Sequence, residues 1–156
     1  MSKFEGWFCD TCGDIIKKAE DGWMEWIEFE DIKGKQKGRN LRLVHHKPAS
    51  PKKSEHGCQF NGDYEFRKDR GVIHDLSLRD FLGPNSLMFL LSLVAENRLP
   101  IQEVLEMIKR LHIPGYEHAR FHFDRAISEG VFEPNTLKGY YWQSDINAIL
   151  KYIEKM

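Results

Sequence analysis

Cysteine and histidine side chains gather in short stretches near the start of the chain. Cys9 and Cys12 are separated by two residues and followed by Gly13, and Cys58 is the third and last cysteine. Two cysteines at this spacing can both reach one ion from a single turn, and Zn²⁺ prefers thiolate and imidazole ligands. Gly13 tolerates the positive φ that such a tight turn requires. These residues therefore predict a zinc site.

A histidine is the expected fourth ligand, and the candidates are His45, His46 and His56. His45 and His46 point to opposite faces of a strand, so only one of them can serve. We favour His45, because it shares a face with the apolar Leu41 and so is expected to point into the protein; His46 is the alternative. His56 is separated from Cys58 by a single residue, which is an unusually tight spacing for two ligands of one ion.

The favoured ligand set, Cys9, Cys12, His45 and Cys58, would close the tetrahedral shell of the ion. A catalytic zinc normally keeps one position open and has a carboxylate base nearby. The His-x-Glu signature of zinc deaminases does not accompany these cysteines. A module of about 60 residues has a small core and gains folding free energy from a bound metal. We therefore expect a structural zinc ion and no enzymatic activity.

The elements expected around this site form a β-hairpin. Residues 23–30 are rich in aromatic side chains and predict a strand. Residues 33–38 are polar and contain two glycines, which predicts a loop, and residues 41–45 predict the return strand. The Cys-x-x-Cys-Gly turn and this hairpin resemble the zinc-ribbon and zinc-knuckle group of small domains over residues 6–60. A second Cys-x-x-Cys pair is missing, so the resemblance leaves the fourth ligand open.

From Ser77 onward, the sequence pattern becomes helical. Val104, Ile108 and Leu111 recur on one face of a helix that begins at Pro100. The other expected elements are helices at 86–97, at 116–130 and from Ser144 onward, and a small hairpin at 131–142. This order resembles a winged helix-turn-helix domain over residues 77–143. The resemblance implies that helix 116–129 takes the position that reads DNA bases in that family.

We predict an α+β protein in two parts. Residues 1–70 form a small zinc-stapled β-hairpin module, and residues 71–156 form a mostly α-helical domain of winged-helix type. The length of 156 residues fits one domain or two small ones.

Charge in this chain is local rather than global. The formal net charge of −1 gives no overall attraction to nucleic acid, but residues 33–55 carry eight basic side chains against one acidic one. We expect contacts with nucleic acid from this basic loop and from helix 116–129. The candidate contact residues are Lys33, Lys35, Lys37, Arg39, Arg120 and Arg125. The alternative is that the basic stretch pairs with the acidic side chains of residues 1–31. In the helix, acidic side chains also offset the charge of the two arginines.

These features together predict a regulatory, zinc-containing, DNA-binding protein. The alternative is a protein-interaction module, such as an adaptor, an inhibitor or an immunity-type protein, and a homodimer is compatible with both roles. The longest apolar run, residues 87–95, is too short to span a bilayer, and the N-terminus lacks the apolar segment of a signal peptide. Three cysteines fit poorly with a secreted disulfide framework. We therefore expect a cytoplasmic protein without membrane contacts.

Overall fold

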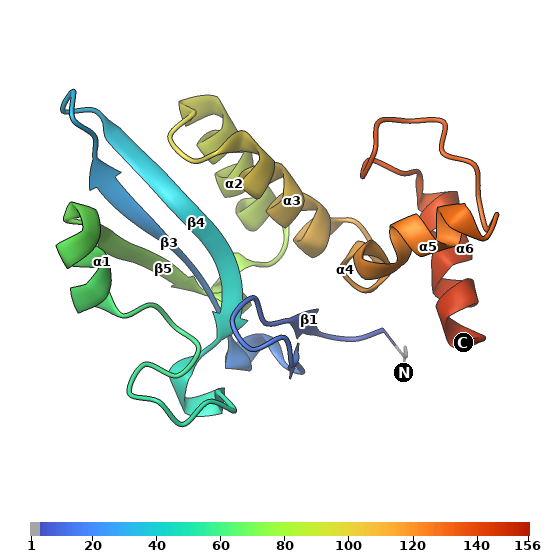
Figure 1. The fold of residues 1–156 in the computed structure, drawn as a ribbon, viewed down its shortest axis with the longest axis horizontal. Helices are drawn as coiled ribbons and strands as arrows, with labels where there is room; N and C mark the ends of the chain where they lie inside the picture. Colours follow the sequence, from blue (N-terminus) through green and yellow to red (C-terminus); the bar gives the residue numbers. More distant parts are fainter. Residues whose placement is uncertain (1–3) are drawn as a thin grey trace. The chain divides into compact units, whose positions relative to one another are not determined.

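A computed structural model describes residues 4–156, and its strands and helices confirm the α+β class (Figure 1). The chain forms two compact units. The first is Glu5–Ile108, and the second is Lys109–Met156, to which Phe4 also belongs. The predicted division between residues 70 and 71 differs from this one: it falls inside the first unit, where the segment after residue 71 pairs with the sheet. Within residues 4–156, the helices are too short or too polar to cross a bilayer.

The first unit is built on an antiparallel three-stranded sheet. β3 (Gly22–Glu30) is the central strand, flanked by β4 (Gln36–His45) and β5 (Val72–Ser77). β3 and β4 are the expected hairpin. Their turn is held by the Asp31 carboxylate, which accepts hydrogen bonds from the backbone N–H groups of Lys33 and Lys35 at 2.9 Å each. β5 was not expected from the sequence, because residues 72–77 mix apolar and charged side chains.

A β-bulge interrupts the β3–β4 ladder. Glu25 pairs with Arg42 and Ile27 pairs with Arg39, so one residue of β3 stands opposite two residues of β4. Asn40 lies in the bulge with a φ of +59°, in the left-handed region that asparagine tolerates better than most residues. The extra residue places Arg39 and Arg42 on the same face of the sheet.

Helix α1 (Gly62–Asp69) lies on this arginine-bearing face (Figure 1). It begins where the Asn61 side chain accepts a hydrogen bond from the backbone N–H of Tyr64, and it ends at Arg70, whose φ is +61°. The Arg39 guanidinium holds the helix to the sheet by ion pairs to its Glu65 and Asp69 carboxylates. Their shortest N–O distances are 2.7 Å and 3.0 Å, respectively.

Helices α2 (Pro84–Glu96) and α3 (Ile101–His112) cover the opposite face of the sheet (Figure 1). They agree with the helices expected from the apolar run and from the stripe after Pro100. Helix α2 packs on the sheet through Phe89, whose ring centroid lies 6.0 Å from that of Trp26. Buried side chains of both helices complete this core: Leu90, Leu93, Val104 and Met107. A short 3₁₀ helix, Leu78–Phe81, connects β5 to α2.

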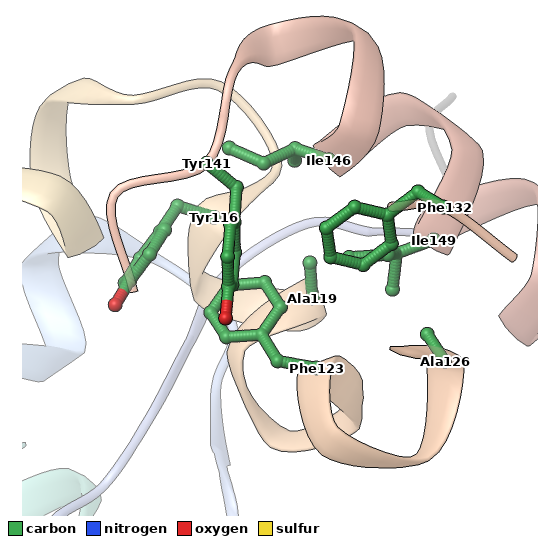
Figure 2. Packing of buried hydrophobic residues seen from close by; sticks show 8 residues of the cluster. All are labelled: Tyr116, Ala119, Phe123, Ala126, Phe132, Tyr141, Ile146 and Ile149. Atoms are coloured by element: carbon green, nitrogen blue, oxygen red, sulfur yellow. The ribbon is translucent and has the colours of Figure 1, made fainter. Parts of the chain in front are cut away.

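The second unit has a separate aromatic core between α4 (Tyr116–Ala119), α5 (Phe123–Ser128) and α6 (Gln143–Glu154). Figure 2 shows the packed side chains. They are Tyr116, Ala119, Phe123, Ala126, Phe132, Tyr141, Ile146 and Ile149. The continuous helix expected over residues 116–130 is divided by a 3₁₀ turn at Arg120–His122. The last helix agrees with the sequence-based expectation.

The hairpin expected over residues 131–142 is not formed, so the second unit lacks the wing of a winged-helix domain. This segment contains no strand. Side chains anchor it instead: Phe132 and Tyr141 stack edge to face at 5.0 Å inside the core, and the Lys109 ammonium donates to the Gly139 carbonyl oxygen at 2.9 Å. Pro134 has no N–H to donate to a strand ladder.

Candidate metal centre

The structure brings Cys9, Cys12, His45 and Cys58 together in the first unit. Cys9 and Cys12 lie in the turn between two short paired strands, β1 (Trp7–Phe8) and β2 (Ile15–Ile16). His45 is the last residue of β4, and Cys58 lies in the loop after a 3₁₀ helix, Lys47–Ala49. Their four ligand atoms all lie within 4.8 Å of one another, and only Cys12 is partly exposed. The favoured ligand set therefore forms one cluster.

The spacing of these atoms fits a tetrahedral zinc ion. The His45 Nδ1 atom lies 3.5 Å from Cys12 Sγ and 3.8 Å from Cys58 Sγ. Zn–S and Zn–N bonds of about 2.3 and 2.1 Å at tetrahedral angles put a sulfur and a nitrogen ligand about 3.6 Å apart. These two distances match the separation of a nitrogen and a sulfur ligand in a Cys₃His zinc site.

The orientation of the His45 ring also suits a metal ligand. Its Nε2 atom lies 3.1 Å from the Ile15 carbonyl oxygen and can donate its hydrogen there. This bond leaves the Nδ1 lone pair directed into the cluster, an arrangement typical of metal-binding histidines. The neighbouring His46 instead stacks on the Trp23 ring with centroids 4.6 Å apart, and His56 lies 3.9 Å from the Glu55 carboxylate. Both lie outside the cluster.

A tight turn positions the two N-terminal cysteines. The Gly13 backbone N–H donates to the Cys9 carbonyl oxygen at 2.9 Å, and the Cys9 N–H donates to the Asp14 carbonyl oxygen at 3.0 Å. Gly13 has a φ of +82°, and open space surrounds the position where a Cβ atom would lie. The backbone conformation, rather than crowding, therefore favours glycine here.

Hydrogen-bonding groups lie close to all three sulfur atoms. The backbone N–H groups of Thr11 and His45 donate to Cys9 Sγ, and that of Asp14 donates to Cys12 Sγ, each over 3.4 Å. The Ser50 hydroxyl lies 3.0 Å from Cys58 Sγ. Such bonds reduce the charge density on thiolates and orient them toward a metal.

The thiols of this cluster differ in acidity. Burial raises the pKa of Cys9, but hydrogen bonds from the backbone N–H groups of Cys12, His45 and Thr11 outweigh burial and lower this pKa to about 7. Burial raises the pKa of Cys12 to about 12, and the neighbouring sulfurs of Cys9 and Cys58 act in the same direction. Several thiolates in one site repel one another, and a divalent cation would compensate that repulsion.

Two residues that the sequence analysis missed hold the third cysteine in place. The Arg42 guanidinium pairs with the Glu25 carboxylate at 2.6 Å and donates to the Cys58 carbonyl oxygen at 3.1 Å. Glu25 is fully buried and also accepts a hydrogen bond from the Phe60 N–H at 2.9 Å. Burial raises the pKa of Glu25, while Arg42 acts against this shift. No local pattern marks this pair, because its members lie on two different strands.

The predicted nucleic-acid contacts are divided between the two units, and three of the six are paired with carboxylates. Lys33 and Lys35 are exposed in the β3–β4 turn, with Lys37 just beyond it, but the hairpin arginine is held by Glu65 and Asp69. The other two arginines belong to the second unit and are also paired. Arg120 lies 2.9 Å from the Glu117 carboxylate, and Arg125 lies 3.3 Å from that of Glu129. These ion pairs reduce the positive charge available for phosphate groups.

The chain matches no protein-family model, no curated protein and no solved structure in the three comparisons that were made. The resemblances to zinc ribbons and to winged-helix domains are therefore not supported by a related family or structure. The four-residue cluster is the feature from which a function can be inferred.

Proposed function

We propose that the first unit binds one Zn²⁺ ion through Cys9, Cys12, His45 and Cys58, and that this ion is structural. The observation that carries the proposal is the convergence of four soft ligand atoms within 4.8 Å. They come from a turn, a strand end and a loop, so one ion would tie three segments of the unit together. Metal binding would then contribute directly to the folding free energy of these segments.

A structural role agrees with the ligand count. Four protein ligands complete the tetrahedral shell that Zn²⁺ prefers in structural sites, whereas catalytic sites keep a position for water or substrate. The hydrogen bonds to all three sulfurs and the Nε2 contact of His45 support a rigid site. We therefore propose that the protein is not an enzyme and that it acts by binding another macromolecule.

The alternative raised by the sequence, a protein-interaction role, is favoured over nucleic-acid binding. The ion pairs of Arg39 and Arg125 support this choice, because they reduce the positive charge of two of the six predicted phosphate contacts. Arg120 shares the Glu117 carboxylate with Arg110. The lysines of the β3–β4 turn remain the strongest candidates for a nucleic-acid surface. The acidic side chains of Glu30 and Asp31 at the same turn reduce its net positive charge.

Two measurements test the proposal. Native mass spectrometry should find one zinc per chain in the wild-type protein and none in the Cys58→Ser variant; a stably folded, metal-free wild-type protein would refute the zinc site. Mobility-shift assays at two salt concentrations should show no complex with duplex or single-stranded nucleic acid. A salt-sensitive complex that is lost when Lys33, Lys35 and Lys37 are replaced by alanine would instead assign the protein to nucleic-acid binding.

A further inference from the structure

One edge of the sheet is closed by hydrogen bonds. Four backbone N–H groups that point outward from β4 have acceptors supplied by other parts of the first unit. These bonds run from Gly38 to the Arg98 carbonyl oxygen, from Leu41 to the Glu103 carboxylate, from Leu43 to the Asp10 carboxylate and from His45 to Cys9 Sγ. The N-terminal turn and α3 thus protect β4 from pairing with another strand.

The opposite edge, formed by β5, is open. Leu41 and Leu43 direct their N–H groups away from β3, so Arg42, which lies between them, exchanges backbone hydrogen bonds with Glu25. The backbone N–H and C=O groups of the even-numbered residues of β3 therefore point toward β5. The even-numbered residues of β5 are their partners, so the N–H and C=O groups of Ile73 and Asp75 point outward. Within residues 4–156, these outward groups make no hydrogen bond. An edge of this kind is a template for another strand.

The side chains of the open edge form a symmetrical pattern. Val72 and Leu76 lie on the same face of β5, on either side of His74, and they are 55 % and 37 % exposed. The His74 ring lies 2.6 Å from the Glu28 carboxylate, which also pairs with Arg98. The strand therefore presents an apolar, a polar and an apolar position in the same order from either direction.

We propose that two copies of the chain pair antiparallel through β5 and join their sheets. The inference concerns the partner of the proposed protein-binding role. In the register centred on His74, the outward groups of Ile73 exchange hydrogen bonds with those of the partner's Asp75. Val72 lies opposite the partner's Leu76 in a non-hydrogen-bonded pair, where cross-strand side chains come closest. A two-fold axis makes each of these contacts twice.

Other registers are less favourable. If the register between the two β5 strands shifted by one residue, the apolar side chains of one copy would lie on the polar face of the other. A register centred on Asp75 would set the two aspartate side chains directly opposite each other, and like charges at this position destabilise a strand pair. The register centred on His74 pairs the apolar side chains of the two copies with each other, which favours a second copy over an unrelated strand.

Native mass spectrometry at low and high micromolar chain concentration tests this inference. Wild-type protein should form dimers whose share rises with concentration. Leu76→Lys should weaken dimerisation by about tenfold or more, because each dimer then holds two lysines against valine. Asp75→Pro should do the same, because it removes an outward N–H without touching the ladder to β3. Ile32→Lys, a change at a fully exposed apolar residue of the β3–β4 turn, should leave the dimer intact.

Circular dichroism, together with the zinc content read from the native mass spectra, verifies that each variant is folded. A wild-type protein that is monomeric at every concentration would overturn the inference, and so would a dimer that survives both β5 substitutions. A monomer that binds an extended segment of another protein through β5 would overturn it as well. The same spectrum separates this proposal from the zinc site: a zinc-loaded monomer contradicts only the dimer, and a metal-free dimer contradicts only the zinc site.

Discussion

The Arg42 guanidinium lies 2.6 Å from the Glu25 carboxylate, and it also donates a hydrogen bond to the carbonyl oxygen of Cys58. Arg42 thereby connects a fully buried acid in the central strand to the loop that carries the third cysteine. The pair belongs to the sheet, but the loop it holds belongs to the metal centre. Stability of the sheet and integrity of the metal centre are therefore linked through one side chain.

Replacing Arg42 by alanine should destabilise the first unit by about 3 kcal/mol at neutral pH, because it leaves the buried Glu25 carboxylate without its counter-ion. Urea denaturation measures this loss. Burial raises the pKa of Glu25 above its ordinary value. The folded variant then binds more protons than the unfolded chain, so its stability falls as pH rises through the raised pKa.

The destabilisation by Arg42→Ala, taken relative to the wild-type protein, should therefore be smaller at about pH 5 than at neutral pH. Glu25→Gln in the Arg42→Ala background is the matched control. It should remove the pH dependence, since it has no carboxyl group to titrate. A destabilisation that is the same at both pH values would contradict the role assigned to the Glu25 charge.

Replacing each of the two adjacent histidines by alanine should distinguish the metal ligand from its neighbour. His45→Ala removes the Nδ1 atom that lies 3.5 Å from Cys12 Sγ and should abolish or greatly weaken zinc binding. His46→Ala removes only the stacking on Trp23 and should retain one zinc per chain. Zinc content after dialysis measures both. Retention by the first variant together with loss by the second would reverse the ligand assignment.

Removal of zinc by a chelator should loosen one region of the chain selectively. Hydrogen exchange should become faster in residues 6–16 and 44–60, because these segments converge on the four ligands. The backbone amides around Ile149 should keep their protection, since the second unit has its own aromatic core. Unchanged exchange in residues 6–16 after verified metal removal would rule out a structural role for the ion.

Ile149→Ala should destabilise the second unit by about 3 kcal/mol, because Ile149 is fully buried among aromatic rings and alanine leaves a cavity. Leu137→Ala is a suitable control in the same unit. Leu137 is 73 % exposed, and its replacement should change stability by less than about 0.5 kcal/mol. Urea denaturation of both variants gives the comparison. Equal effects would contradict the core described for this unit.

Features that depend on local chemistry could be predicted from the sequence. The Cys9–Cys12 turn needs only its own residues, and the alternation that selected His45 holds because Leu41, Leu43 and His45 all lie beyond the bulge at Asn40. The amphipathic stripe of α3 likewise arises within one helix.

Features that depend on distant partners could not be predicted. β5 has no clear alternation, and its conformation is stabilised by pairing with β3. From the sequence, the Arg39 guanidinium is expected to carry an unpaired positive charge, but in the fold it pairs with the carboxylates of Glu65 and Asp69. The helix expected over residues 116–130 is interrupted at Arg120–His122, although its buried side chains keep a helical spacing. Segment 131–142 is likewise organised by the burial of Phe132 and Tyr141.

The bulge at Asn40 has a consequence for changes in chain length. Arg39 and Arg42 share a face only because one extra residue stands between them in the ladder. Deleting Asn40 would reverse the faces on which the side chains of residues 36–39 lie. Arg39 would then face Leu99, and α1 would lose its ion pairs to Arg39. Insertions and deletions are usually tolerated near exposed hairpin tips. In this hairpin, a gain or loss of one residue should be tolerated within residues 31–35 and rejected a few positions later.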